Sequence, residues 1–253
     1  NVNVSVTDFI GGGLALEVIN VMSPLTLAAS YKVIDMIFEW ILEENYEAGQ
    51  IKTKKQPSRW TFAEKIAFIS MEKLAYPPEM QLHPFLRDYL YAVYNNLREY
   101  RNEIVHRNRV SVAADGKLSV EYHDAESTTH SLVVDRRTLQ ALVQVSVQVA
   151  ELLVTSTPLD SVAEAEIKFK LDQMSTIHIL DEFKQRRPVR MDVNLRRPQV
   201  DGAWHVDLNW VRSEVERIHP SEYVVFDLNV IGLVGEIEAA RWRIPFNGLS
   251  DAE

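Results

Sequence analysis

The spacing of hydrophobic residues predicts helices through much of the chain. Between residues 23 and 185, hydrophobic residues recur three and four positions apart, which is the period of one helix face. Ser23 followed by Pro24 has the pattern of a helix start, and Thr61 with Glu64 forms a capping box. The predicted helices run from Ser23 to about Tyr46, from Thr61 to about Tyr76, from His83-Pro84 onward, from Asp135 to about Thr155, and from Asp160 or Ser161 through Leu171 and as far as Lys184.

Alternating hydrophobic and polar residues predict strands at other places. Residues 110–112 and 118–122 alternate on either side of Asp115-Gly116, which is a strong hairpin signal, and residues 131–134 are a candidate third strand. The alternating valines at positions 2, 4 and 6 predict a short strand, which the flexible turn Gly11-Gly12-Gly13 ends. After Arg187 the predicted strands are 191–195, 223–231 and 236–244, with a short helix over 209–218.

These elements predict a mainly α protein with three parts. Residues 1–22 form the N-terminal strand and Gly-rich turn, and residues 23–185 form a bundle of four to five helices with an inserted β-hairpin. Residues 186–253 form a small C-terminal α+β unit, because their pattern changes from helical to strand-like spacing.

Composition narrows the classes of function. Of the 253 residues 46% are hydrophobic and 25% are charged, which is ordinary for a soluble globular protein. There is no cysteine, so disulfides, zinc–thiolate sites and thiol nucleophiles are excluded. No segment approaches the length of a membrane span, and we expect no membrane partner. The glycine run lacks the Lys-Ser/Thr of a phosphate-binding loop, and neither a Gly-x-Ser-x-Gly nor a Gly-x-Gly-x-x-Gly motif occurs, so no cofactor is expected.

Positive charge is clustered although the net charge is −9. An acidic chain is not expected to wrap nucleic acid non-specifically, because affinity for phosphates comes from local lysines and arginines. Two clusters of basic residues occur. The first comprises Arg98, Arg101, Arg107 and Arg109, and the second comprises Lys184, Arg186, Arg187, Arg190, Arg196 and Arg197. The second cluster is equally well explained as a solvated surface.

The helix that begins near His83-Pro84 carries the most informative residues of the chain. At about 100° per residue, its hydrophobic residues form one stripe, whereas Asn102 and His106, one turn apart, point roughly the opposite way. Arg101 precedes this pair, so an arginine, an amide and a histidine lie near the end of one amphipathic helix. The stripe comprises Leu86, Leu90, Val93, Leu97, Tyr100 and Ile104.

The residues Arg101-Asn102-x-x-x-His106 resemble the R-x(4–6)-H motif of the HEPN superfamily, in which a polar residue usually follows the arginine. The resemblance implies a helical bundle that works as a homodimer, and a metal-independent endoribonuclease of the toxin or phage-defence type in the cytoplasm. An antitoxin or other regulatory protein is an expected partner. Some HEPN toxins are regulated by modification of a tyrosine two positions after the histidine, and here that position holds Asn108.

These residue types suit RNA cleavage without a metal, since the RNA supplies its own 2′-hydroxyl nucleophile. Histidine titrates near neutral pH, so His106 could take the 2′ proton or protonate the departing 5′ oxygen. Arg101 could hold the phosphate with its planar fork, and Asn102 could orient the imidazole or bind the scissile phosphate. Tyr91 and Tyr94 are expected on the neighbouring surface, where they could stack on unpaired bases or pack at the dimer interface, and packing is the more common role. The candidate RNA-binding residues are Arg98, Arg107, Arg109 and Tyr91.

Several alternatives remain open from the sequence. Arg212 and His219 also fit the arginine–histidine spacing, but Ser213 stands in place of the amide. His123 and His130 flank a loop with Asp124 and Glu126, where a solvated hairpin is more probable than a metal site. The main rival function is a non-catalytic HEPN-like module that recruits a protein or RNA, and a third possibility is an unrelated helical protein that binds a small ligand.

Overall fold

The structure, a computed structural model, describes residues 12–107, 109–195, 207, 209–210, 213–214, 217 and 224–244. The described residues fall into two compact units. The first lies within residues 1–158 and 170–182, and the second lies within residues 159–169 and 183–253.

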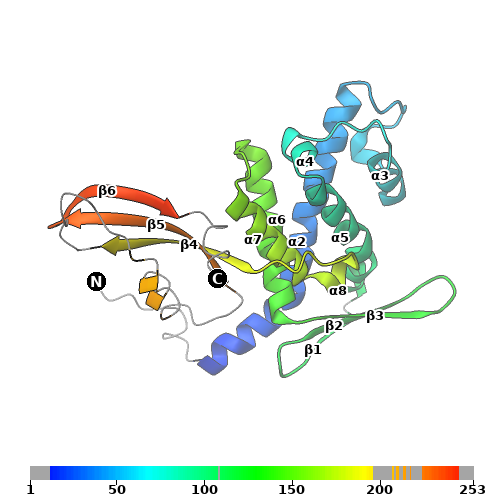
Figure 1. The fold of residues 1–253 in the computed structure, drawn as a ribbon. Helices are drawn as coiled ribbons and strands as arrows, with labels where there is room; N and C mark the ends of the chain where they lie inside the picture. The colour runs from blue at the N-terminus through cyan, green and yellow to red at the C-terminus, as the bar shows by residue number, and fades with distance from the viewer. Residues whose placement is uncertain are drawn as a thin grey trace. The chain divides into compact units, whose positions relative to one another are not determined.

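The first unit combines helices with a three-stranded antiparallel sheet of order β1-β2-β3 (Figure 1). Its long helices α2, α5 and α6 form the core: α2 contacts α3, α5 and α6, and α5 contacts α4, α8 and β2. The elements are α2 (Gly12–Glu47), η1 (Pro57–Arg59), α3 (Phe62–Ile69), α4 (Pro78–Leu82), α5 (Pro84–Asn102), η2 (Glu103–Arg107), β1 (Val110–Val112), β2 (Leu118–His123), β3 (Thr129–Val134), α6 (Arg136–Thr155) and α8 (Ser175–His178).

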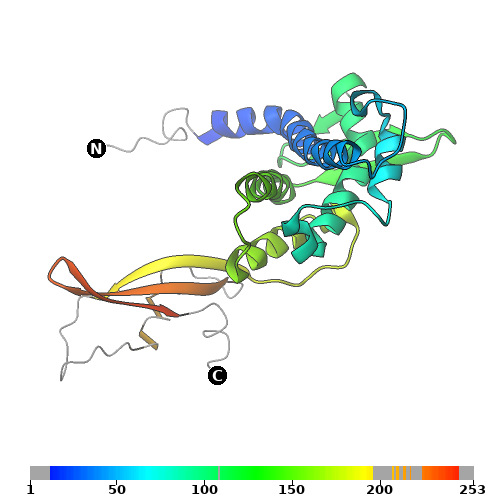
Figure 2. The ribbon, with the colours of Figure 1, turned by 90° about the horizontal axis from the view of Figure 1, so that it is seen from above.

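The second unit contains a three-stranded sheet of order β4-β5-β6 (Figure 2). β4 (Arg187–Leu195) and β5 (Val224–Val234) are parallel, and β5 and β6 (Ile237–Ile244) are antiparallel. Gly235 has a φ of +63° in the tight turn between β5 and β6, a conformation that glycine adopts without steric cost. Residues 161–169 of α7 (Ser161–Asp172) also belong to this unit.

Helix α5 is anchored by one buried face. The predicted stripe residues Leu86, Leu90, Val93 and Leu97 are each at most 1% exposed, so this part of the amphipathic pattern is confirmed. The buried face is wider than the stripe, because Tyr94 is also fully buried. Its ring stacks on Tyr31 of α2 at 5.4 Å between centroids, and its centroid lies 5.1 Å from that of Phe38 and 5.0 Å from that of Phe62. The prediction that Tyr94 lies on the surface is therefore wrong.

A network of charged residues joins α2, α3 and α5 beneath this aromatic cluster. The carboxylate of Asp35 accepts hydrogen bonds from Tyr94 Oη (2.7 Å), Lys65 Nζ (3.1 Å) and Lys32 Nζ (2.6 Å). Burial by itself raises the pKa of Asp35, but the hydrogen bonds from Lys32, Tyr94 and Lys65 outweigh it and hold the pKa below its usual value. The folded chain therefore favours the ionised carboxylate.

We expect the Asp35→Asn variant to be less stable than the parent chain at pH 7, with a difference that shrinks in acid. A lowered pKa in the folded state contributes stability above the unfolded-state pKa of about 4, and this contribution is lost as the pH falls through the folded-state pKa. The measurement is the urea unfolding midpoint of both proteins from pH 7 to pH 3. A difference that stays constant over this range would contradict the role of the ionised carboxylate.

The predicted fold class is wrong in one central respect. The described residues contain seven α-helices and two three-stranded sheets, and 55% of them are helical, so the fold is mixed α/β and not a HEPN-like four- to five-helix bundle with an insertion. Only α2, α5 and α6 are long, whereas α3, α4 and α8 span no more than eight residues, which is little over two turns at about 3.6 residues per turn. Short helices cannot form the continuous layer of a bundle, and the sheets supply part of the packing.

Three predicted helix boundaries are also wrong. Helix α7 ends at Asp172, well before Lys184. Helix α2 begins at Gly12 rather than Ser23, so Pro24 lies inside it and Gly12 and Gly13 belong to the helix rather than to a turn. Helix α3 ends at Ile69, well before Tyr76, and a separate short helix starts at Pro78. The predicted strand over residues 2–6, like Gly11, lies outside the described residues.

The predictions that depend only on neighbouring residues are confirmed. The Thr61–Glu64 capping box is present, Asp135 caps α6 by accepting from the backbone of Thr138, and α6 ends at Thr155. The hairpin turns at Asp115-Gly116 with a third strand on its other side, and the strands after Arg187 form as predicted over their described residues. Positions 209, 210, 213, 214 and 217 of the predicted short helix are helical.

One described helix, α6, is long and apolar enough to cross a membrane by length and composition alone, so the expectation that no segment approaches this length is wrong. Half of its most apolar window is buried inside the structure, and Leu142 and Val149 are fully buried. This is the burial expected of a core helix in a globular protein.

Candidate active site at the end of helix α5

The three motif residues lie where α5 changes its winding. Residues Pro84–Asn102 are α-helical, and Glu103–Arg107 form a single π-helical turn, η2. In an α-helix, residues five apart are rotated by about 140° from each other. A π-helical turn is wider and joins residues five apart by its hydrogen bonds, which brings such residues to the same side. Arg101 and His106 are five apart, so the turn brings them together.

Arg101 is the central residue of the resulting cluster. Its Nη1 atom lies 3.2 Å from Asn102 Oδ1 and 3.5 Å from His106 Nε2, the second being at the outer limit of a hydrogen bond. The sequence paired Asn102 with His106, whereas in the structure Arg101 contacts both. A guanidinium can only donate, so His106 Nε2 is the acceptor in this contact.

Burial differs along the motif in a way that suits binding from solvent. His106 is exposed, whereas Arg101 and Asn102 are half-buried, and the Nε atom of Arg101 is buried without a hydrogen-bond partner. Burial and the charge of Asp35 raise the pKa of Tyr31 on α2, and the charges of Arg101 and Arg98 oppose that rise. The guanidinium of Arg101 is therefore partly withdrawn from solvent, whereas the imidazole beside it is accessible.

Glu103 is a buried carboxylate that the sequence analysis did not single out. Its side chain is 4% exposed, and Oε1 accepts a 2.7 Å hydrogen bond from Arg107 Nη1. Arg109 Nε lies 3.9 Å from Oε2, and the backbone N–H of Arg109 donates to the Glu103 carbonyl. Glu103 thus ties both ends of η2 together. Its four-residue spacing from Arg107 was the available signal, since such pairs meet on one helix face.

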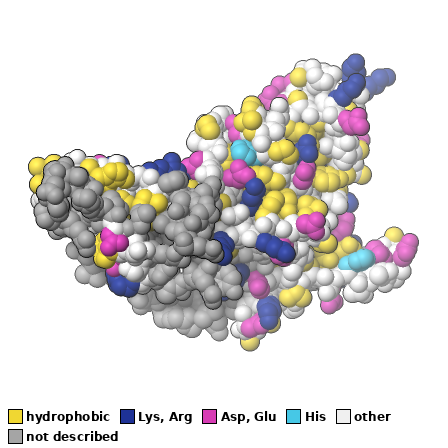
Figure 3. Space-filling view, viewed as in Figure 1, with side chains coloured by type: hydrophobic (Ala, Val, Ile, Leu, Met, Phe, Trp, Pro, Cys, Tyr) yellow, Lys and Arg dark blue, Asp and Glu magenta, His cyan; other side chains and the backbone are white. Residues whose placement is uncertain are grey.

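The four predicted RNA-binding residues lie in two groups. Arg107 and Arg109 are paired with Glu103 beside the motif, and their side chains remain more than half exposed. Arg98 and Tyr91 lie farther back along α5: Arg98 covers the ring of Phe62 at 4.3 Å and pairs with Glu99 at 3.0 Å. Tyr91 Oη lies 3.3 Å from Ser70 Oγ. Figure 3 shows cationic and anionic side chains interspersed over the described part of the face drawn, with no broad basic patch among the described residues there.

The hairpin histidines are held by their own loop. His130 Nε2 lies 2.8 Å from Asp124 Oδ2, and His130 stacks on Tyr122. His123 Nδ1 lies 3.1 Å from Thr129 Oγ1. Among the residues that the structure describes, no group of three His, Asp or Glu side chains is placed to hold a metal ion.

The second basic cluster is partly neutralised where it is described. Arg190 bonds to Asp160 at 2.7 Å and to the buried Asp227 at 3.2 Å, and Arg243 bonds to Asp227 at 3.0 Å. A paired arginine offers less charge to a phosphate than a free one. Arg196, Arg197, the alternative pair Arg212 and His219, and Asn108 lie outside the described residues.

Comparison with models of known protein families found no match, and comparisons with curated proteins and with solved structures found none either.

Proposed function

We propose that the chain is a metal-independent endoribonuclease whose reaction centre is Arg101, Asn102 and His106. The observation that carries the proposal is the 3.5 Å contact between Arg101 Nη1 and His106 Nε2 across the π-helical turn. A permanent cation and a proton-transfer group at this separation can contact one phosphate together. The resemblance of the motif to that of HEPN ribonucleases supports the same function, although the fold is not the helical bundle that the resemblance implied.

The proposed reaction uses the substrate's own nucleophile. The 2′-hydroxyl oxygen forms a bond to the adjacent phosphorus, the bond from phosphorus to the 5′ oxygen breaks, and the 2′ proton leaves as the 5′ oxygen gains one. His106 transfers one of these two protons. Arg101 stabilises the added negative charge, and Asn102, which accepts from Arg101, holds the guanidinium in place. The products are a 2′,3′-cyclic phosphate and a 5′-hydroxyl.

A second copy of the chain supplies the other proton transfer in this proposal. His106 is exposed and Val105 beside it is 46% exposed, which suits a symmetric contact that places two motifs in one cleft. Cytoplasmic location and a role as a toxin or defence effector, with an antitoxin or regulator as partner, are part of the same proposal and rest on the motif resemblance.

We expect the purified chain to cleave single-stranded RNA in the presence of EDTA and to leave a 2′,3′-cyclic phosphate, detected by mass spectrometry of the products. The same oligonucleotide with one 2′-deoxy nucleotide at the cut should remain intact at that position, because the attacking group is missing. Strict dependence on a divalent ion, or cleavage at the 2′-deoxy position, would overturn the mechanism. Binding of RNA without cleavage would instead support the non-catalytic binding module.

A further inference from the structure

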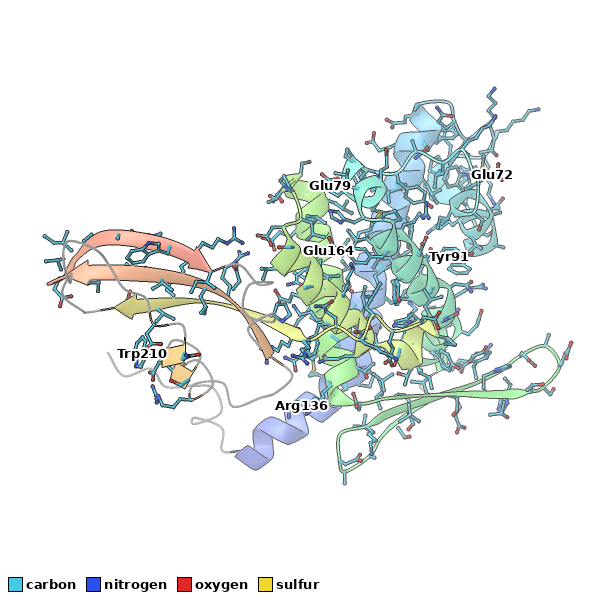
Figure 4. The ribbon with its side chains drawn as sticks, in the orientation of Figure 1. Glu72, Glu79, Tyr91, Arg136, Glu164 and Trp210 are labelled. Atoms are coloured by element: carbon cyan, nitrogen blue, oxygen red, sulfur yellow. The ribbon has the colours of Figure 1, made fainter. Side chains whose placement is uncertain are left out.

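A cleft lies on the first unit where the segment after α3 meets α5. Its volume is about 300 Å³, at the lower end of the range for small-ligand sites. Figure 4 labels Glu72 and Tyr91, which line the cleft from the segment after α3 and from α5. The other polar and aromatic lining residues are Ser70, Tyr76, Arg87 and Asp88.

Two fixed tyrosines give this cleft aromatic surface. Tyr91 is half-buried, and its hydroxyl lies 3.3 Å from Ser70 Oγ, which restrains the ring. The Tyr76 hydroxyl donates to the Ile69 carbonyl at 2.9 Å, and the guanidinium of Arg87 lies 5.5 Å from the centre of the Tyr76 ring. Restrained aromatic rings are suited to stacking against a planar ligand, because little side-chain freedom is lost on binding.

The charges of the cleft select against a phosphate. Arg87 is paired with Asp88 at 2.8 Å, and Glu72 adds a second carboxylate, so anions outnumber the cation. Carboxylates accept hydrogen bonds from amino groups, and their pairing with the amino group of cytosine is an example from nucleic-acid recognition. The ligand that fits is a neutral planar ring with an exocyclic amino group.

The position of the cleft on α5 relates it to the candidate active site. Arg98 follows Tyr91 by seven residues, and Asn102 follows Arg98 by four. At about 100° per residue, all three lie within about 20° of one line along the helix. Tyr91 then lies about 16 Å along the axis from Asn102, with the partly exposed Arg98 between them. A stacked strand advances about 3.4 Å per nucleotide, so this distance spans about five stacked nucleotides, or fewer in an extended strand.

We infer that the cleft binds one unpaired, amino-bearing base of the RNA strand that is cut at Arg101 and His106, about three to five nucleotides from the cut. This inference rests on the proposed function for the identity of the ligand as RNA. Tyr91 stacks on the base, Glu72 and Asp88 accept from its amino group, and Arg98 contacts the intervening phosphates.

The test uses the His106→Ala protein, which keeps RNA intact during the measurement. Its affinity is measured by fluorescence anisotropy for a set of single-stranded RNAs in which one abasic nucleotide is moved along the strand. One abasic position should weaken binding by about 5- to 150-fold, the usual effect of losing one base–aromatic stack. At that position, cytosine should bind more tightly than uracil. Adding Tyr91→Ala should weaken binding of the intact RNA about as much as the abasic nucleotide does, and should abolish the effect of the abasic position. Tyr91→Phe keeps the ring and should retain the effect of the abasic position.

Three results would overturn the inference. The first is that the protein does not bind RNA, and the second is a flat abasic profile, in which the affinity is the same wherever the abasic nucleotide is placed. The third is an equal loss of affinity at the abasic position in proteins with and without the Tyr91 ring. Circular dichroism of the Tyr91→Ala protein checks that the half-buried position tolerates the change. Cleavage by the parent chain is assayed separately. RNA cleavage with a flat abasic profile contradicts the cleft alone, and a Tyr91-dependent abasic profile without cleavage supports the cleft while contradicting the ribonuclease proposal.

Discussion

The His106→Ala variant should lose about 100- to 10,000-fold in the rate of RNA cleavage, which is the usual contribution of general acid–base catalysis. The loss should come without a change in stability, because the side chain is exposed and only its weak contact with Arg101 is removed. Initial rates on a fluorescent single-stranded RNA and a urea unfolding curve measure the two quantities.

Two other histidines serve as controls for this result. His123 is an exposed hairpin residue bonded to Thr129, and His219 belongs to the second arginine–histidine pair in the sequence. Replacement of either by Ala should leave the rate within about twofold of the parent chain, far below the loss expected of a catalytic group. An equal loss in His219→Ala and His106→Ala would mean that the wrong pair was chosen as the active site.

The same variant tests whether two copies share one site. Mixing the parent chain with an excess of the His106→Ala protein should lower the rate per active subunit, since most active subunits then pair with an inactive one. A chain that sediments as a monomer over the active concentration range and keeps its full rate would exclude a composite site.

The Tyr94→Ala variant should lose about 3–5 kcal/mol of unfolding free energy, the range for deleting a large buried aromatic side chain. Tyr94 is fully buried among Tyr31, Phe38 and Phe62, and its hydroxyl donates to Asp35, so the change leaves both a cavity and a missing donor. Equilibrium unfolding in urea, followed by tryptophan fluorescence, measures the loss.

Two matched variants separate the parts of this effect. Tyr94→Phe keeps the ring and removes only the hydroxyl, and should cost about 1–3 kcal/mol because Asp35 retains its two lysines. Tyr122→Ala removes a tyrosine that is only half-buried on β2, and should cost about 1 kcal/mol or less. A loss at Tyr94 no larger than at Tyr122 would show that the aromatic cluster does not anchor α5.

Features that depend on neighbouring residues could be predicted from the sequence. The Asp135 cap, the Thr61–Glu64 capping box and the hairpin at Asp115-Gly116 need only contacts within a few residues, so their patterns are sufficient. The buried stripe of α5 follows equally directly, because the helical period places those residues on one face. The motif residues could also be identified in this way, although their chemistry remains a prediction.

The fold class, the burial of Tyr94 and the geometry of the candidate site could not be predicted, because they depend on contacts between distant parts of the chain. Pro24 lies inside α2 although its local pattern marks a helix start, and α3 ends at Ile69 although no helix-breaking residue follows directly. Regular α-helical spacing also placed Arg101 and His106 on different sides. The π-helical turn, spanned by the buried Glu103 and its bonds to Arg107 and the backbone of Arg109, brings them to 3.5 Å. The physical reason is that burial of a side chain, and any departure from regular helical winding, depend on packing partners distant in the sequence, which a local pattern does not contain.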